Sequence, residues 1–211
     1  MHSKLLIFIS GLFCVLSAET VIAEVVQIDA AVTSDYVWRG LTQTKGKAAV
    51  SGGIEKVTDG AWYFGAWASN TQHETYDFGS AELDLYAGMS GQGESLGYDF
   101  GYISYQYLAY SGQDFSEMYF ALMSGKFTFK YSYSSSVGTY LEMSMKYGLA
   151  IKKGATVIIH AGNYSRNKAG SYSDYSASLK YKTFSFTVSK ANVDSAQDKN
   201  VKVYVGWSRH F

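Results

Sequence analysis

From residue 24 to the end, apolar and polar residues alternate along the chain with a period of two. The clearest example is 127–133, Phe-Thr-Phe-Lys-Tyr-Ser-Tyr, in which every second residue is aromatic. The segments 83–89, 141–149 and 184–189 repeat the pattern with other side chains. A period of two predicts β-strands with one apolar and one polar face. No run of about 18 apolar residues follows residue 24, so the pattern does not predict a membrane-spanning helix.

The connections between these strands are of two kinds, and the two kinds alternate. The short ones are 58–60, 91–95, 124–126, 152–154 and 182–183. The longer, polar ones are 40–47, 70–80, 111–116, 166–173 and 194–200, and a shorter member of this set lies at 135–139. Short turns that alternate with longer loops are typical of up-and-down transmembrane barrels, in which the turns are periplasmic and the loops lie outside.

The predicted fold is therefore all-β, a transmembrane up-and-down antiparallel β-barrel of about twelve strands. The predicted strands are 26–39, 48–57, 61–69, 81–90, 96–107, 117–123, 127–134, 140–150, 155–164, 174–181, 184–192 and 201–211. Twelve strands of about ten residues leave about six residues for each connection. Ten strands remain if 61–69 and 117–123 are not strands. An even number places both ends of the barrel on the periplasmic side.

The N-terminal residues have the pattern of a secretory signal peptide. A short basic start precedes an apolar run at 5–16, and the small residues at 21–23 fit a cleavage site. We expect residues 1–23 to be the signal peptide and residues 24–211 to be the barrel domain. The single cysteine, Cys14, lies in the signal peptide, so the mature chain has no disulfide.

The composition supports a membrane barrel over a soluble β-protein, which would alternate with the same period. Aromatic residues make up 17% of the chain and charged residues only 17%, and 18 basic residues balance 18 acidic ones. That balance argues against a nucleic-acid-binding protein. The chain ends on an aromatic residue, as the assembly signal of outer-membrane barrels does, and we assign this signal to Tyr204, Gly206 and Phe211. Arg209 departs from that signal, which has an apolar residue at this position.

We therefore expect a monomer in the outer membrane of a Gram-negative bacterium. Its expected partners are outer-membrane lipid, the barrel-assembly machinery, which would bind the C-terminal strand, and a small polar solute.

Strand parity assigns charged side chains to the inside of the barrel, with opposite signs in its two halves. The predicted acidic wall consists of Asp29, Asp35, Glu55, Glu82, Asp84, Asp99 and Glu117. The predicted basic wall consists of Arg39, Lys130, Lys146, Lys180 and Lys202, of which Arg39 alone comes from the first half. His160, His210 and one acid, Glu142, also face inward in the second half.

Opposed walls in a barrel of intermediate width favour a narrow, passive pore for small polar or charged solutes. The seven acids favour cations slightly. If both walls face water, Asp84→Asn and Lys146→Gln shift ion selectivity in opposite directions. The alternative is a closed structural or adhesin-like barrel, in which the inward charges pair with one another and the outer loops bind partners.

The sequence does not predict an enzyme. We find no Gly-x-Ser-x-Gly motif, and His73, His160 and His210 pair with no serine in a recognisable pattern. His73 and Glu74 could contact a cation, but they lack the spacing of a metal site. We therefore predict no catalytic, cofactor-binding or metal-binding residues. A lipid-modifying barrel enzyme is the least favoured alternative.

Residues 34–50, Ser-Asp-Tyr-Val-Trp-Arg-Gly-Leu-Thr-Gln-Thr-Lys-Gly-Lys-Ala-Ala-Val, resemble the opening signature of the TorF-type porin family. Further similar segments follow in order at 65–70, 82–88 and 98–105. Members of this bacterial family were formerly described as conserved hypothetical proteins. The resemblance extends over the mature chain and implies an outer-membrane barrel with pore function, without a substrate.

The first of these segments includes two inward charges, Asp35 and Arg39, at the end of the first predicted strand. Four residues span about 13 Å along a strand, too far for the two to pair. We therefore expect each to pair with a residue on the second or the twelfth strand.

Overall fold

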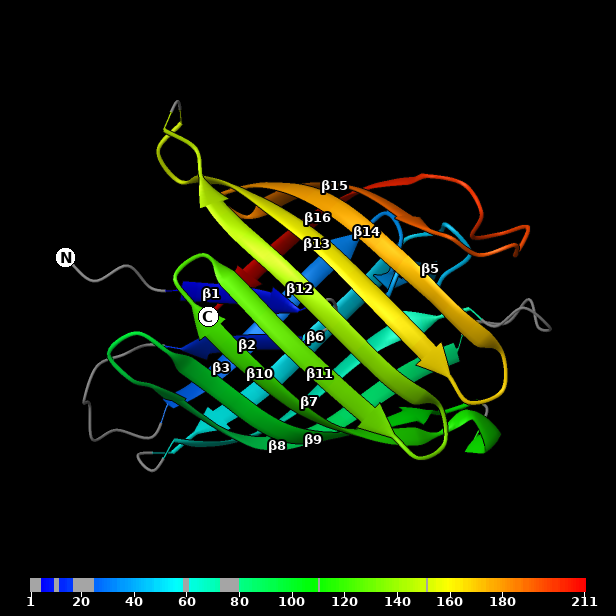
Figure 1. Cartoon of the computed structure of the whole chain (residues 1–211), viewed down its shortest axis with the longest axis horizontal. Coiled ribbons are helices and arrows are strands. Elements are labelled where there is room, and N and C mark those ends of the chain that lie inside the picture. Colours follow the sequence, from blue (N-terminus) through cyan, green and yellow to red (C-terminus); the bar gives the residue numbers. More distant parts are fainter. Residues whose placement is uncertain are drawn as a thin grey trace.

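Twelve antiparallel strands close into a barrel in the computed structural model, which describes residues 5–9, 12–16, 25–58, 61–72, 80–109, 111–150 and 152–211 (Figure 1). Each strand pairs with its neighbours in the chain, and β16 pairs with β3 to close the sheet. The strands are β3 (Val25–Thr33), β6 (Ala49–Val57), β7 (Trp62–Thr71), β8 (Ser80–Gln92), β9 (Gly97–Tyr107), β10 (Phe115–Ser124), β11 (Phe127–Ser134), β12 (Gly138–Gly148), β13 (Ala155–Arg166), β14 (Gly170–Tyr181), β15 (Phe184–Ala191) and β16 (Lys202–His210).

Two short hairpins and one helical turn complete the described residues. β1 (Leu5–Ile9) and β2 (Leu12–Leu16) pair with each other in a separate sheet within the predicted signal peptide. The predicted cleavage site at 21–23 lies outside the described residues. β4 (Val37–Trp38) and β5 (Leu41–Thr42) form the second hairpin, and a single 3-10 turn, η1 (Ser111–Gln113), precedes β10. No helix in the described part of the chain is long and apolar enough to cross a membrane.

The predicted all-β barrel is confirmed, with twelve strands rather than ten. The two segments in doubt, 61–69 and 117–123, are β7 and β10. Most predicted boundaries lie within a few residues of the observed ones. The first strand is the exception: it was predicted to span 26–39 but ends at Thr33. The residues that follow leave the wall of the barrel.

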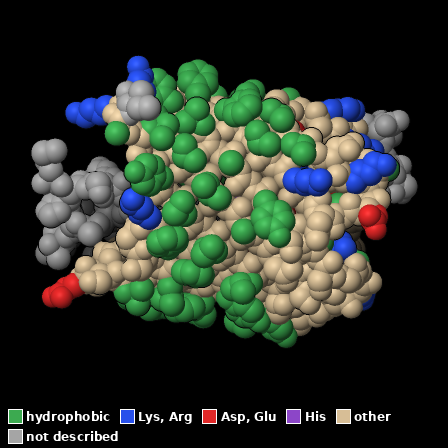
Figure 2. Space-filling model, turned by 45° about the horizontal axis from the view of Figure 1, so that its top comes forward, with side chains coloured by type: hydrophobic (Ala, Val, Ile, Leu, Met, Phe, Trp, Pro, Cys, Tyr) green, Lys and Arg blue, Asp and Glu red, His purple; other side chains and the backbone are tan. Residues whose placement is uncertain are grey.

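The alternation places apolar side chains on the outside of the barrel and polar ones inside. On β11, Phe129 and Tyr131 are 51% and 47% exposed, whereas Lys130 and Ser132, which follow them, are buried. On β9, Tyr98, Phe100 and Tyr102 are exposed and the two residues between them are buried. Figure 2 shows hydrophobic side chains spread over the barrel wall, with most charged side chains towards its ends. A soluble protein has the opposite arrangement, so this outer face suits a hydrocarbon solvent.

The two ends of the barrel differ in their connections. β3 begins and β16 ends at the same end, where the backbone N–H of Phe211 donates to the carbonyl of Ile28 at 2.9 Å. This end, here called the terminal end, has the short turns. In the turn between β14 and β15, Lys182 has a φ of 54°, a left-handed conformation suited to a two-residue hairpin turn. The opposite end has the longer connections and is called the loop end.

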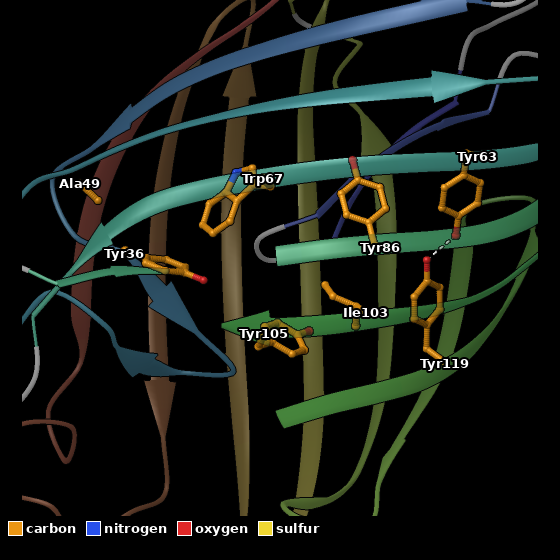
Figure 3. Close-up of a cluster of buried hydrophobic side chains, with 8 residues drawn as sticks. All are labelled: Tyr36, Ala49, Tyr63, Trp67, Tyr86, Ile103, Tyr105 and Tyr119. Atoms are coloured by element: carbon orange, nitrogen blue, oxygen red, sulfur yellow. Dashed lines mark hydrogen bonds between the residues drawn. The ribbon is translucent and has the colours of Figure 1, made fainter. Parts of the chain in front are cut away.

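Aromatic side chains fill one half of the lumen, the half enclosed by β6–β10. The buried cluster consists of Tyr36, Ala49, Tyr63, Trp67, Tyr86, Ile103, Tyr105 and Tyr119 (Figure 3). Glycines on the neighbouring strands make room for the rings, since a Cβ at Gly65 would lie 2.2 Å from the Tyr86 ring. We call this side the packed half. The side formed by β11–β16 and β3 is the open half.

Candidate functional site

Residues 34–47 fold into the lumen as a hairpin instead of extending the first strand. β4 and β5 are joined by Arg39 and Gly40, whose φ angles of 48° and 78° are both left-handed. Two successive left-handed residues form the tight turn that best fits a two-residue hairpin. We call residues 34–47 the lumen hairpin.

Hydrogen bonds among its own side chains hold the base of the lumen hairpin. The Asp35 carboxylate accepts hydrogen bonds from the hydroxyls of Thr42, at 2.5 Å, and Thr44, at 3.1 Å. The backbone N–H of Tyr36 donates to the Thr44 hydroxyl at 3.0 Å. The prediction that Asp35 pairs with the second or twelfth strand is therefore wrong, because its partners lie within the same hairpin.

The tip of the lumen hairpin reaches the packed half through Arg39. Its guanidinium donates two hydrogen bonds to the Glu117 carboxylate of β10, at 2.8 and 2.7 Å, and both side chains are buried. The rings of Trp38, Tyr140 and Tyr164 surround it, at 4.2, 4.2 and 4.7 Å from ring centroid to Cζ. Burial alone lowers the pKa of Arg39, but the Glu117 carboxylate outweighs burial and raises it, so Arg39 stays charged.

Backbone atoms at the tip bind the opposite side of the barrel. The carbonyl of Arg39 accepts a hydrogen bond from the Tyr172 hydroxyl of β14 at 3.0 Å. The carbonyl of Gly40 accepts one from Lys202 Nζ of β16, also at 3.0 Å, and Lys202 forms an ion pair with Asp198 at 2.9 Å. The lumen hairpin thus spans the barrel from β10 to β14 and β16. The prediction that Arg39 extends the first strand and pairs with a neighbouring one is wrong.

The space around Gly40 shows how tightly the tip of the lumen hairpin packs against the barrel wall at β14. A Cβ at Gly40 would lie 2.6 Å from Cβ of Asp174, whereas a Cβ at Gly46 would meet nothing within 4 Å. Both glycines have positive φ, so alanine costs about 1–2 kcal/mol of backbone strain at either position. We expect Gly40→Ala to lower the free energy of unfolding by about 1–3 kcal/mol more than Gly46→Ala. Urea unfolding followed by tryptophan fluorescence measures both variants. Equal losses would contradict the observed contact.

The residues of the predicted acidic wall occupy three different environments. Glu55, Glu82, Asp84 and Asp99 are buried in the packed half, and Asp99 accepts a hydrogen bond from the Tyr63 hydroxyl at 2.6 Å. Glu117 binds Arg39, and Asp35 belongs to the lumen hairpin. Asp29 lies near the terminal end, where it pairs with His210. Five of the seven carboxylates thus lie on strands of the packed half, and the other two lie on β3 and in the lumen hairpin.

The predicted basic residues also separate into groups. Lys130 is buried on β11, its ammonium 4.2 Å from the centroid of the Tyr119 ring, and it pairs in register with Glu142. Lys202 holds the lumen hairpin at the loop end. Lys146 and Lys180 are half-buried on β12 and β14, towards the terminal end.

A cavity of about 280 Å³ lies in the open half. The lumen hairpin lines it at the loop end, and it extends to the turn at Lys182 and Thr183 at the terminal end. Much of its lining is hydroxyl-bearing: Thr33, Ser51, Thr128, Ser144, Ser176, Ser178, Thr183, Ser185, Thr187, Ser189, Tyr204 and Ser208. The unfilled space of the lumen therefore lies along the strands that carry the lysines.

His160 lies in this cavity between carboxylates on both neighbouring strands. Its Nε2 is 3.0 Å from Asp174 Oδ1 and 3.0 Å from the Tyr140 hydroxyl, and its Nδ1 is 3.5 Å from Glu142 Oε2. A catalytic triad needs one ring nitrogen bound to a carboxylate and the other turned towards a serine. Both nitrogens of His160 face carboxylates, so Ser144 and Ser176, opposite it in register, have no histidine base here.

Two parts of this site were missed by sequence reasoning. Asp174 lies within a predicted strand and has the parity of Lys180, so the rule that assigned the other charges also assigns Asp174 to the lumen. Tyr140 and Tyr164 also have the parity of inward-facing residues, but their contact with Arg39 depends on the lumen hairpin.

His73 and Glu74, which could contact a cation, lie outside the described residues. Within the described ranges, no group of three or more His, Cys, Asp or Glu side chains could hold a metal ion.

Solved structures with a similar fold include two of a porin. The KdgM porin aligns with a TM-score of 0.60 at 11% identity, over 88% of this chain and 98% of KdgM. The KdgM porin in complex with disordered oligogalacturonate aligns with a TM-score of 0.54 at 11% identity, over 89% of this chain and 98% of that one. LpxR from Salmonella typhimurium aligns with a TM-score of 0.50 at 10% identity, over 88% and 99% of the two chains. At these identities the similarity shows the fold alone.

The family of the chain follows from its sequence. No curated protein matches it significantly. The TorF resemblance stays an expectation, because the family that matches bears another name. Residues 17–210, which include the whole barrel, match the family described as bacterial protein of unknown function (Gcw_chp). The chain belongs to this Gcw_chp family.

Proposed function

We propose that the protein is a porin-like channel of the bacterial outer membrane that passes small polar or charged solutes. The observation that carries this proposal is the polar cavity inside a closed barrel whose outer face is apolar. A barrel coated with exposed aromatic and aliphatic side chains is stable in a bilayer, and hydroxyls and charges inside it can replace water around a solute. The fold shared with the KdgM porin supports the same function.

The proposal includes the location and the assembly of the barrel. A barrel with an apolar outer face suits the outer membrane, and Tyr204, Gly206 and Phe211 remain the proposed signal for the assembly machinery. Phe211 is 66% exposed at the terminal end and accessible to a partner. We propose a monomer, since a closed barrel has no unpaired edge strand to share.

The lumen hairpin is the proposed constriction of this channel. It closes the loop end above the cavity, and its contacts with Glu117, Tyr172 and Lys202 cross the lumen. Solutes would therefore pass between the hairpin and the wall of the open half. The acids of the packed half do not line the cavity. The charged residues that do are four basic and three acidic ones: Arg39, Lys130, Lys180, Lys182, Asp35, Glu142 and Asp174. We infer a preference for anions, opposite to the slight cation preference expected from the charge count.

Ion selectivity tests which residues border the path. We expect Lys180→Gln to shift the reversal potential under a salt gradient towards cation selectivity, because it removes a positive charge from the cavity lining. Asp84→Asn is the matched control: Asp84 is 2% exposed and packed among aromatic rings, so we expect no shift. Opposite shifts of similar size in the two variants would mean that both walls face the solute, and would contradict the inferred path.

Liposome swelling tests the function itself. The full chain, folded into vesicles, is expected to admit small solutes such as glycine and monosaccharides and to exclude trisaccharides. Vesicles that contain the folded barrel but stay impermeable to all of these would favour the closed structural or adhesin-like alternative.

We propose that the protein is not an enzyme, because both ring nitrogens of His160 face carboxylates. A lipid hydrolase activity in the same vesicles would contradict this.

A further inference from the structure

Basic side chains follow one another around the terminal end of the barrel, on the side of the open half. Lys126 lies in the turn between β10 and β11, and Lys152 and Lys153 lie in the turn between β12 and β13. Lys182 lies in the turn between β14 and β15, and Arg209 lies near the end of β16. All five residues are exposed. We call these five residues the basic rim.

Three lysines of the basic rim contact tyrosine rings on the barrel wall. Lys126 Nζ lies 4.1 Å from the centroid of the Tyr147 ring. Lys152 Nζ and Lys182 Nζ lie 5.1 and 5.5 Å from the centroid of one ring, that of Tyr181, so two successive turns bring their ammonium groups to the same place. An aromatic ring attracts a cation but carries no net charge. These contacts therefore hold the ammonium groups in place without neutralising them.

The tyrosine rings belong to the outer face of the barrel. Tyr147 is 48% exposed, and Phe184, which pairs in register with Tyr181, is 63% exposed. Tyrosines at the ends of the outer apolar band are typical of the interface between lipid and water. The ammonium groups over these rings therefore lie at the level of the lipid headgroups.

Arg209 extends the basic rim along the last strand. It alternates with the exposed Val203 and Val205 and is itself exposed, so it lies on the outer face. Its Cζ is 5.0 Å from the centroid of the Phe211 ring. A basic residue at this position, where the assembly signal has an apolar one, is suited to the headgroup region because its charge can reach the phosphate layer.

Acidic side chains do not compensate this charge among the described residues. The basic rim forms no ion pair there. At the terminal end Asp29 and Glu55 belong to the lumen, where Asp29 pairs with His210 and Glu55 is buried. Glu94 is exposed in the turn between β8 and β9, which belongs to the packed half. Glu24 and Asp59 lie outside the described residues.

We propose that the basic rim binds the headgroups of anionic phospholipids in the leaflet at the terminal end. The acyl chains of such a lipid lie along the apolar wall, and its phosphate accepts hydrogen bonds from the lysines and from Arg209. Basic residues close to a membrane surface attract anionic lipids in this way. A membrane is favoured over an acidic soluble protein, because the lysines rest on outward tyrosines beside the apolar band. The inference rests on the membrane location in the proposed function, but it does not require that solutes pass.

Electron paramagnetic resonance of spin-labelled lipids tests this proposal on the full chain in phosphatidylcholine vesicles. The fraction of motionally restricted label gives the association constants of phosphatidylglycerol and of phosphatidylcholine for the barrel. We expect the first to be at least about twofold higher in the wild type. A ratio of one would overturn the proposal and favour a soluble partner at the basic rim.

Matched double variants locate the preference on the barrel. Lys152→Gln with Lys182→Gln, which removes both ammonium groups over Tyr181, should lower the ratio by at least about half of its excess over one. Lys168→Gln with Lys199→Gln removes the same charge from exposed positions at the loop end and should leave the ratio unchanged. Equal ratios in the two variants would overturn the proposal, because the preference would then depend on total charge alone.

Salt and current provide two further arms. In about 1 M salt the Debye length is about 3 Å, so the preference should disappear, and a preference that persists would contradict binding through charge. A barrel that prefers phosphatidylglycerol but passes no current would support the basic rim and overturn the channel. A barrel that conducts without any lipid preference would overturn the basic rim alone.

Discussion

Arg39→Ala is expected to lower the free energy of unfolding by about 3–5 kcal/mol, because it leaves the buried Glu117 carboxylate without its cation. Arg39 is 5% exposed and Glu117 is 3% exposed, so water cannot replace the lost partner. The substitution also frees the tip of the lumen hairpin from β10. In a bilayer we therefore expect a higher single-channel conductance, or larger fluctuations of the current, than in the wild type.

Matched variants separate the ion pair from the loss of bulk. Arg39→Ala combined with Glu117→Gln removes both charges and is expected to recover part of the stability, which a double-mutant cycle measures. Lys47→Ala removes an exposed cation from the same hairpin and should cost less than about 0.5 kcal/mol. If Arg39→Ala unfolds at the same urea concentration as Lys47→Ala, the hairpin is not anchored through Glu117.

Phe120→Arg is expected to destabilise the barrel in a bilayer by about 2–4 kcal/mol. Phe120 is at the middle of β10 and 45% exposed, and it pairs in register with two more exposed aromatics, Phe100 and Tyr131. A charge at this depth would lie in the hydrocarbon core, where no water solvates it. Urea unfolding of vesicle-embedded protein measures the loss.

The depth of the substitution provides the control. Phe127 lies at the terminal end of β11 and is also 45% exposed, so Phe127→Arg should cost only about 0–1 kcal/mol near the interface. The difference between the two variants should disappear in short-chain detergent with a thin, mobile apolar layer. Equal costs at the two depths in a bilayer would mean that the outer face does not contact lipid.

The strands of this protein were predictable because the period of two follows from backbone geometry and is independent of the surroundings. Parity likewise predicted that Glu55, Asp99 and Lys130 point inward. The parity of a residue along its strand does not predict which other side chains it contacts inside the barrel. Whether a given carboxylate meets water or a tyrosine ring depends on contacts between strands far apart in the sequence, such as Tyr63 with Asp99.

The lumen hairpin was missed because Asp35 and Arg39 continue the alternation of the first strand. A local signal was present, since an Xaa-Gly pair between the apolar residues Trp38 and Leu41 is typical of a two-residue hairpin turn. The inward direction of this hairpin depends on Glu117, Tyr172 and Lys202, which are more than 75 residues away. No pattern within the segment carries that information.

Planar-bilayer conductance of the folded full chain, with reversal potentials under a salt gradient, tests the central claim most directly. The channel proposal predicts discrete, stable current steps, with a reversal potential of the sign expected for anion selectivity. A barrel that inserts into the bilayer, as protease protection of its strands can verify, and yet passes no current would contradict the proposed channel.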